Sequence, residues 1–297
     1  MELWVKHVSV HGYADDTSTS VSAATEEEAI KKLESDAARI LNYMASNSLV
    51  ANPQKTGFLF IRAKNSGGNP SKIRVGDSMI EENDHHRILG IVVNNTLTWS
   101  DHVYGGLIQD INRRIGALKR VSYYLPRKYL PEIASATIAS KIRYGIPVYG
   151  AVRQNELDPK PGMYSDLQIA LNTAMRVASG KRLVDRVSIA NLSAMTKIKS
   201  FNHMAAEEML ALVWHGIKDA NSPLFGTFEV VGETSGKSTR ARERGDLRNL
   251  AKTSLGQRNL PHSAIQLWNQ CDASLREIEA KSTAKKKIRQ ISSSLPL

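Results

Sequence analysis

The chain opens with a period-two pattern of apolar and polar residues. In residues 3–13 valines alternate with polar side chains, and residues 17–23 form a second, β-branched stretch. Alternation of this kind is typical of strands, and aspartate is common in the tight turn between two strands. The pattern predicts a β-hairpin with Asp15 and Asp16 at its tip.

After the hairpin, the spacing of apolar residues lengthens to that of a helix. Thr25 and Glu28 have the spacing of a helix-capping box. The apolar residues that follow share one helical stripe: Ile30, Leu33, Ala37, Ile40, Leu41 and Met44. Three further stretches have the composition of strands and are separated by turn-forming residues: 57–63, 72–80 and 86–94.

From residue 100 onward the period is mainly helical. The predicted helices occupy residues 100–123, 128–144, 165–179, 186–197 and 200–219. A loop-rich stretch at 221–238 is the predicted linker, and the C-terminal tail is basic, with a lysine run at 285–287. Strands with one helix, followed by many helices, indicate an α+β module joined to a helical one.

Charge is unevenly distributed along the 297 residues. Residues 1–60 have a net charge of −3, residues 61–180 of +6 and residues 181–297 of +8, which gives +11 for the chain. A surplus of this size favours a polyanionic partner, nucleic acid first and an anionic membrane surface second. A basic protein without such a partner is the alternative that composition leaves open.

Cysteine content and hydropathy exclude several classes of protein. Cys271 is the only cysteine, which excludes an intrachain disulfide and a zinc site built from several cysteines. A lone cysteine fits a reducing compartment, so we expect an intracellular protein of the nucleus or cytoplasm. No apolar run approaches the length of about 18 residues that a membrane-spanning helix needs, so we expect no membrane partner.

The adjacent aspartates have three plausible uses. They can bind Mg²⁺, act as an acid–base pair, or remain solvated in an ordinary turn. Mg²⁺ takes one or two carboxylates and completes its shell with water and phosphate oxygens. Two such ions can clamp the attacking and leaving oxygens of a phosphoryl transfer. The pair by itself leaves the three uses open.

The residues around the two aspartates favour the first of these uses, metal binding. The sequence Tyr-Ala-Asp-Asp at 13–16, between two predicted strands, resembles the palm-domain signature of reverse transcriptases. Three later segments resemble further blocks of that family in the right order: "LNYMASNSLVANPQKTGFLFI" at 41–61, "ILGIVVNNTLTWSDHV" at 88–103, and 259–290. The last resembles the tail of non-LTR, LINE-type, jockey-like retrotransposons, although Gln270, Cys271 and Ala284 depart from the family pattern.

The resemblance implies roles for residues at and near the hairpin. Asp15 would be a ligand of the catalytic metal, Mg²⁺ or Mn²⁺, and Asp16 the second acidic residue of the site. Tyr13 would lie against the nucleotide or the primer end, and a packed strand aromatic is the alternative. Lys55 stands where the family has a lysine suited to protonating pyrophosphate, and a solvated loop lysine is the alternative.

The resemblance also implies contacts with nucleic acid. Leu89 and Gly90 match the primer-grip hairpin, where glycine lets the backbone approach the primer, although a plain strand bend fits as well. Four cations of the predicted helix 100–123 would contact phosphates along a thumb-like helix, or else form a solvated face: Arg113, Arg114, Lys119 and Arg120.

The implied fold is α+β and has three parts. A partial polymerase palm, made of a β-hairpin, a helix and strands, would occupy residues 1–98. A mainly α-helical thumb or connection region would occupy 99–220, and a basic C-terminal region 221–297.

Reverse transcriptases need residues that this sequence does not contain. Their third catalytic carboxylate and their fingers come from upstream of the signature, but only twelve residues precede Tyr13 and Glu2 is the only acid among them. We therefore expect a truncated RNA-directed DNA polymerase, descended from an enzyme that copies an RNA template from a DNA primer by two-metal nucleotidyl transfer. Alone it would be inactive, unless another chain supplies the fingers and the missing half of the palm. The alternatives are a non-catalytic, basic nucleic-acid-binding remnant and a chain that does not fold stably.

Overall fold

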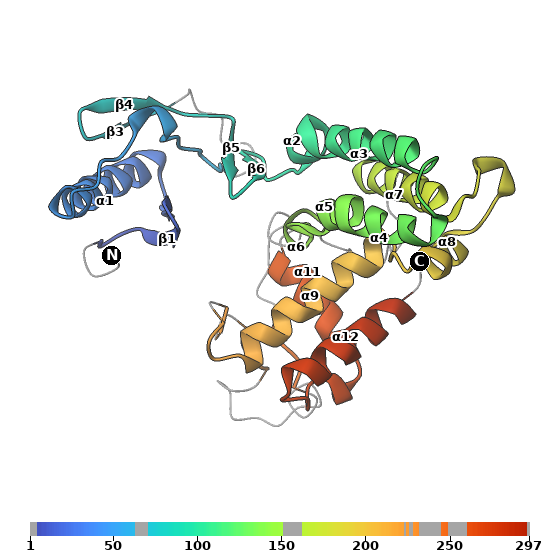
Figure 1. The fold of residues 1–297 in the computed structure, drawn as a ribbon. Helices are drawn as coiled ribbons and strands as arrows, with labels where there is room; N and C mark the ends of the chain where they lie inside the picture. The colour runs from blue at the N-terminus through green and yellow to red at the C-terminus, as the bar shows by residue number, and fades with distance from the viewer. Residues whose placement is uncertain are drawn as a thin grey trace. The chain divides into compact units, whose positions relative to one another are not determined.

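The protein has a mixed α+β fold that divides into two compact units (Figure 1). The computed structural model describes residues 5–62, 71–150, 162–222, 224–225, 228–231, 245–248 and 260–295. The N-terminal unit is Met1–Trp99 and the C-terminal unit is Ser100–Leu297. The C-terminal unit includes both of the regions that the sequence analysis separated at residue 220.

The described strands of the N-terminal unit form three two-stranded antiparallel sheets (Figure 1). The pairs are β1 (Ser9–Tyr13) with β2 (Asp16–Ser20), β3 (Lys72–Val75) with β4 (Ser78–Glu81), and β5 (His85–Ile88) with β6 (Ile91–Asn94). The first pair is the hairpin that the sequence predicts, with Tyr13 opposite Asp16.

Two predicted strands are each a hairpin instead of a single strand. Residues 72–80 fold back between β3 and β4, where Gly76 has φ 62°. Residues 86–94 fold back between β5 and β6, where Leu89 has φ 48° and Gly90 φ 84°. Two-residue turns need this left-handed backbone to match the strand twist, and glycine adopts it without strain. The single strands predicted from residue pattern were wrong because they ran through both glycines, although the family resemblance placed Leu89 and Gly90 at a hairpin.

The third predicted strand, 57–63, is also wrong over the residues that the structure describes. Only Phe58 pairs there, through an isolated parallel bridge with Glu82. Its ring is buried with Ile73 and Ile80 in a small core. The apolar pattern that resembled a strand thus reflects Phe58 and Phe60, which pack in or against this core without forming a strand.

Helix α1 (Glu26–Ser46) covers this small core, as its apolar stripe predicts. The hydroxyl of Thr25 accepts a hydrogen bond from the backbone N–H of Glu28 at 3.2 Å and caps the helix. Ile30 and Leu33 pack against the core residues.

The C-terminal unit is mainly helical in its described residues, with one isolated antiparallel bridge between Val230 and Leu247. Its longer helices are α3 (Ile108–Val121), α7 (Met163–Ser179), α8 (Ile189–Thr196), α9 (Phe201–Lys218), α11 (Leu260–Gln270) and α12 (Lys281–Ser294). The shorter ones are α2 (Ser100–His102), α4 (Leu130–Ala134), α5 (Ser140–Arg143) and α6 (Ile146–Tyr149). One turn of π-helix connects α2 to α3 (Val103–Leu107), and another connects α4 to α5 (Ser135–Ala139). These helices confirm the helical periodicity after residue 100, whereas most of the predicted linker 221–238 lies outside the described residues.

The core of the C-terminal unit joins distant parts of the sequence. Trp214 of α9 and Trp268 of α11 lie in one buried cluster with Ile288 of α12. The indole N–H of Trp214 donates to the carbonyl of Ile278 at 3.0 Å. Helices α9, α11 and α12 therefore form one packed body (Figure 1).

Candidate functional site

The β1–β2 hairpin presents both aspartates of the Tyr-Ala-Asp-Asp sequence to solvent. Ala14 and Asp15 form the turn, and Asp16 is the first residue of β2. Both carboxylates are exposed, and neither makes a hydrogen bond or ion pair with any described side chain. Tyr13 precedes them with 68% of its surface exposed. The hairpin therefore holds two carboxylates that are open to a cation and an aromatic ring that is open to a ligand.

A buried carboxylate anchors the segment that leads into this hairpin. Oδ2 of Asp36, on α1, accepts backbone N–H groups from Lys6 at 3.0 Å, His7 at 2.6 Å and Val8 at 3.0 Å. Its Oδ1 lies 2.8 Å from Nη1 of Arg39. Burial opposes ionisation of Asp36, but the three N–H donors and Arg39 outweigh it and hold its pKa below the ordinary value. The rigid helix thus positions the start of β1.

A second charged network joins α1 to the strand region. The guanidinium of Arg62 pairs with Glu82 and with Glu26, whose Oε1 lies 2.8 Å from Nη2. Ser71 donates to both carboxylates, by its hydroxyl to Glu26 and by its N–H to Glu82 at 3.0 Å. The hydrogen bonds from Arg62 hold the pKa of each glutamate below its ordinary value. This ion-pair network connects α1 with residues 62, 71 and 82, beside the small apolar core that the same segments share.

The other predicted polymerase residues of the N-terminal unit lie on separate exposed segments. Lys55 ends a short 3₁₀ helix, Pro53–Lys55, and its side chain is exposed. Leu89 and Gly90 form the turn between β5 and β6, so the predicted primer-grip pair does lie at a hairpin tip. In the described residues no hydrogen bond or ion pair connects Lys55 with Asp15 or Asp16.

No metal-binding cluster is complete in the part of the chain that the structure describes. A group of three or more His, Cys, Asp or Glu side chains suited to a cation does not occur there. The oxygens of Asp15 and Asp16 are of the kind that Mg²⁺ and Mn²⁺ bind, but two carboxylates leave most of the coordination shell to water or to other molecules.

The four predicted phosphate-binding cations lie on α3 but differ in their surroundings. Nε of Arg114 lies 3.1 Å from Oδ2 of Asp110, and its Nη1 donates to the carbonyl of Thr137 at 3.1 Å. Arg114 therefore already has protein partners. The other three side chains, Arg113, Lys119 and Arg120, are exposed.

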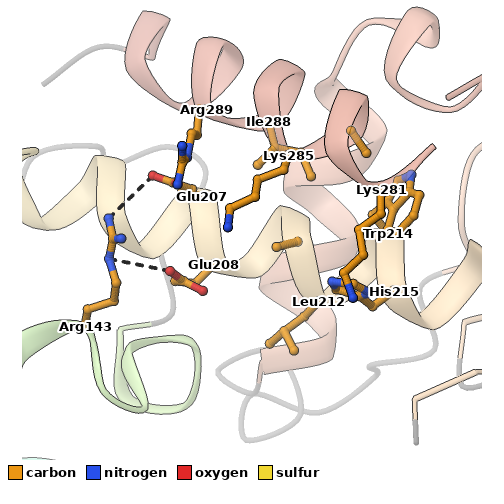
Figure 2. A pocket seen from close by; sticks show the side chains of 12 residues that line it. Arg143, Glu207, Glu208, Leu212, Trp214, His215, Lys281, Lys285, Ile288 and Arg289 are labelled. Carbon is orange, nitrogen blue, oxygen red and sulfur yellow. Dashed lines mark hydrogen bonds and ion pairs between the residues drawn. The ribbon is translucent and has the colours of Figure 1, made fainter. Parts of the chain in front are cut away.

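A pocket of about 300 Å³ lies between α9 and α12 in the C-terminal unit (Figure 2). Lys281, Lys285 and Arg289 extend into it from α12. Glu207 and Glu208 face it from α9, and both pair with Arg143 of α5 at 3.5 Å.

The two pocket carboxylates have opposite pKa shifts. Burial raises the pKa of Glu208 above its ordinary value. Glu207 is also buried, yet Lys199, with Nζ 2.9 Å from Oε2, together with Arg143 and Arg289, holds its pKa below the ordinary value. These charge pairs connect α5, α9 and α12, so the pocket supports an architectural role.

Sequence reasoning missed Asp36 and Glu207. Both have a signal in the sequence, because each interrupts the apolar face of a helix. Asp36 stands on the stripe between Leu33 and Ile40, and Glu207 lies between Met204 and Leu210. A charged residue on such a face indicates a buried partner.

No protein-family model, curated protein or solved structure matches this chain. The reverse-transcriptase assignment thus stays a prediction from the sequence motifs. Across the described residues, no helix combines the length and apolar character needed to cross a bilayer.

Proposed function

We propose that this chain carries part of an RNA-directed DNA polymerase of a non-LTR retrotransposon, with partial palm and thumb regions, in which the β1–β2 hairpin presents Asp15 and Asp16 to Mg²⁺ or Mn²⁺. The proposal rests on the exposure of both carboxylates at a tight turn, one residue after an exposed tyrosine. RNA template and DNA primer are the nucleic acids that such a site would serve.

The hairpin would supply only some of the groups that nucleotidyl transfer needs. Asp15 would bind the metal, Asp16 would support it, and Lys55 would stabilise charge that develops on the pyrophosphate. Two carboxylates bind Mg²⁺ weakly, so these residues need a further carboxylate from another chain segment before they can catalyse nucleotidyl transfer. The β1–β2 pair is two-stranded among the described residues, which leaves backbone groups at its edges for a partner strand.

Primer extension tests the proposal. The full chain is mixed with an RNA template, a DNA primer, Mg²⁺ or Mn²⁺ and deoxynucleotides, with and without a separate fragment that supplies fingers and an upstream palm strand. We expect extension only with the fragment, and its loss in Asp15→Asn. Asp77→Asn, at the exposed turn between β3 and β4, is the matched control and should extend as the parent does. Absence of extension in every mixture would contradict the catalytic proposal.

Nucleic-acid binding without catalysis is the second candidate function, and a different observation favours it. The C-terminal unit contains 30 Lys/Arg against 17 Asp/Glu, a net charge of +13. Arg113, Lys119 and Arg120 are exposed on one of its helices. Binding by phosphate contacts weakens steeply with salt, so a salt titration of RNA binding tests this function. Asp15→Asn separates the two functions, because it should abolish synthesis and leave this binding unchanged.

A further inference from the structure

The loop that follows α3 exposes aromatic rings to solvent. Tyr123 and Tyr124 are each 88% exposed, and Tyr129 is 46% exposed. Tyrosine is an amphipathic side chain that usually buries its ring and leaves only its hydroxyl in water. Two neighbouring rings that are almost wholly exposed indicate a surface that contacts another molecule.

Basic side chains surround these rings. Lys119 and Arg120 precede the tyrosines and Arg127 and Lys128 follow them, all four exposed. Residues 119–129 contain no aspartate or glutamate. Such a loop complements a polyanion that also has flat rings.

A second basic loop lies against the first. The guanidinium of Arg127 packs onto Gly180, with Nη1 2.8 Å from the position that a Cβ atom would occupy there. Gly180 ends α7 with φ 68°, so the chain turns directly under this arginine. Residues 180–186 therefore extend the surface that Tyr123 and Tyr124 begin.

The second loop adds both charge and apolar area. Lys181, Arg182 and Arg186 are exposed, while Leu183 and Val184 are 76% and 73% exposed at its tip.

Its one acid, Asp185, accepts the backbone N–H of Arg182 at 2.7 Å and lies 4.0 Å from that guanidinium. Together, residues 119–129 and 180–186 hold seven cations and one acid. We name these two segments the tyrosine–arginine surface.

We propose that the tyrosine–arginine surface binds single-stranded nucleic acid, with Tyr123 and Tyr124 stacked on bases and the surrounding cations on phosphates. The bases of a duplex are already stacked on one another, whereas a single strand offers its ring faces to aromatic side chains. The excess of positive charge favours a polynucleotide over a protein partner. The inference rests on the second candidate function and adds its site and its substrate class.

Fluorescence anisotropy with the full chain tests the inference. The probes are labelled oligo(U) RNA and oligo(dT) DNA of about 12 nucleotides and a duplex of equal length. The double variant Tyr123→Ala/Tyr124→Ala should weaken single-strand binding about tenfold or more and change duplex binding much less. Tyr123→Phe/Tyr124→Phe should bind as the parent does, because the ring stacks and the hydroxyl does not. The two single-stranded probes show whether the surface distinguishes RNA from DNA.

Two controls separate stacking from charge and from misfolding. Phe225→Ala removes another exposed ring of the same unit, 52% exposed and without a lysine or arginine within five residues, and should leave binding unchanged. Lys128→Gln should lower the slope of log affinity against log salt by about 0.7, the share of one phosphate contact on a single strand. Helical circular dichroism checks that each variant is folded.

The outcomes distinguish this inference from the function on which it rests. If the parent chain binds no polynucleotide at about 50 mM salt, nucleic-acid binding is wrong and the inference is wrong with it. If the parent binds but the double alanine variant binds equally well, the surface assignment alone is wrong. Equal loss of duplex and single-strand binding would overturn the single-strand preference, and a protein bound in place of nucleic acid would overturn the substrate class.

Discussion

The two units stabilise their folds by different means. In the N-terminal unit the buried cluster is small, with Phe58, Ile73 and Ile80 at its centre, and each described sheet has only two strands. In the C-terminal unit helices α9, α11 and α12 share one large buried cluster that includes Trp214 and Trp268. An isolated hairpin is marginally stable in water, so the N-terminal unit depends on specific polar contacts where the C-terminal unit depends on apolar burial.

The two units also differ in net charge. The N-terminal unit has a net charge of −2, from 10 Lys/Arg and 12 Asp/Glu, against +13 in the C-terminal unit. In the N-terminal unit, Asp36 and Arg62 use charge to connect segments of the fold. In the C-terminal unit, surplus cations such as Lys128 lie on the surface, where they are accessible to a polyanion. Ion pairs thus connect segments of the fold in both units, but only the C-terminal unit also has a surplus of cations that suits a polyanion.

The largest expected effect is in the apolar core of the C-terminal unit. Trp268→Ala removes a side chain that is 1% exposed and should lower the free energy of unfolding of this unit by roughly 3–5 kcal/mol. Urea unfolding measures the decrease in the free energy of unfolding. Hydrogen exchange shows which segments are destabilised, and the amides of α9 and α12 should exchange faster. Met195→Ala, at a side chain 46% exposed, should change stability by less than about 0.5 kcal/mol. An equal acceleration of amide exchange in the N-terminal unit would contradict the division of the chain into two separately stabilised units.

The next effect concerns the buried carboxylate of the N-terminal unit. Asp36→Ala leaves three backbone N–H groups without their acceptor and should destabilise this unit by about 2–3 kcal/mol. Hydrogen exchange of residues 6–13 is the measurement. Glu27→Ala, an exposed carboxylate on the same helix, is the control and should have a small effect.

The contribution of Asp36 to the stability of the N-terminal unit should depend on pH. Because the folded state lowers the pKa of Asp36, its contribution is complete above the unfolded-state value of about 4 and is lost as pH falls through the lower, folded value. Asp36→Asn should remove this part of the acid sensitivity. An unchanged acid profile in that variant would show that other carboxylates, such as Glu82, dominate.

The smallest effect is a stabilisation at the hairpin turn. Ala14 has φ 53°, a left-handed conformation that strains residues with a Cβ atom. Ala14→Gly should therefore stabilise the β1–β2 hairpin by about 1 kcal/mol and slow exchange of its amides. A matched substitution on a strand, Ser18→Gly, should weaken the hairpin. If Ala14→Gly also weakens it, side-chain contacts of Ala14 outweigh its backbone strain.

Local patterns predict the elements with regular periods. The β1–β2 hairpin and α1 follow from alternation and from a helical stripe with a Thr25 cap, because these signals depend on neighbouring residues alone. The β3–β4 hairpin was missed because its strands have four residues each, too few for a period to show. The local sign of the turn was the pair Gly76 and Asp77, which is a two-residue hairpin signal.

Contacts between residues far apart in the sequence explain why local patterns predict only part of each candidate site. That Asp15 and Asp16 lie at an exposed turn could be predicted from the sequence, whereas their roles rest on a family resemblance and stay predictions. The Tyr123–Tyr124 pair is visible in the sequence as a doublet at the end of the predicted helix 100–123. The pair lies near residues 180–186 because Arg127 packs onto Gly180. Several helices separate these two residues in the sequence, so a local pattern cannot predict their contact.

The two π-helical turns of the C-terminal unit make it unevenly tolerant of changes in chain length. Each turn, at Val103–Leu107 and Ser135–Ala139, accommodates an additional residue inside an otherwise continuous helix. Deleting one residue there would convert the wide turn to α-helical geometry and keep the flanking faces in register. The same deletion in the middle of α9 would rotate everything beyond it by about 100° away from its neighbours. Natural insertions and deletions in related chains should therefore accumulate at these two turns first.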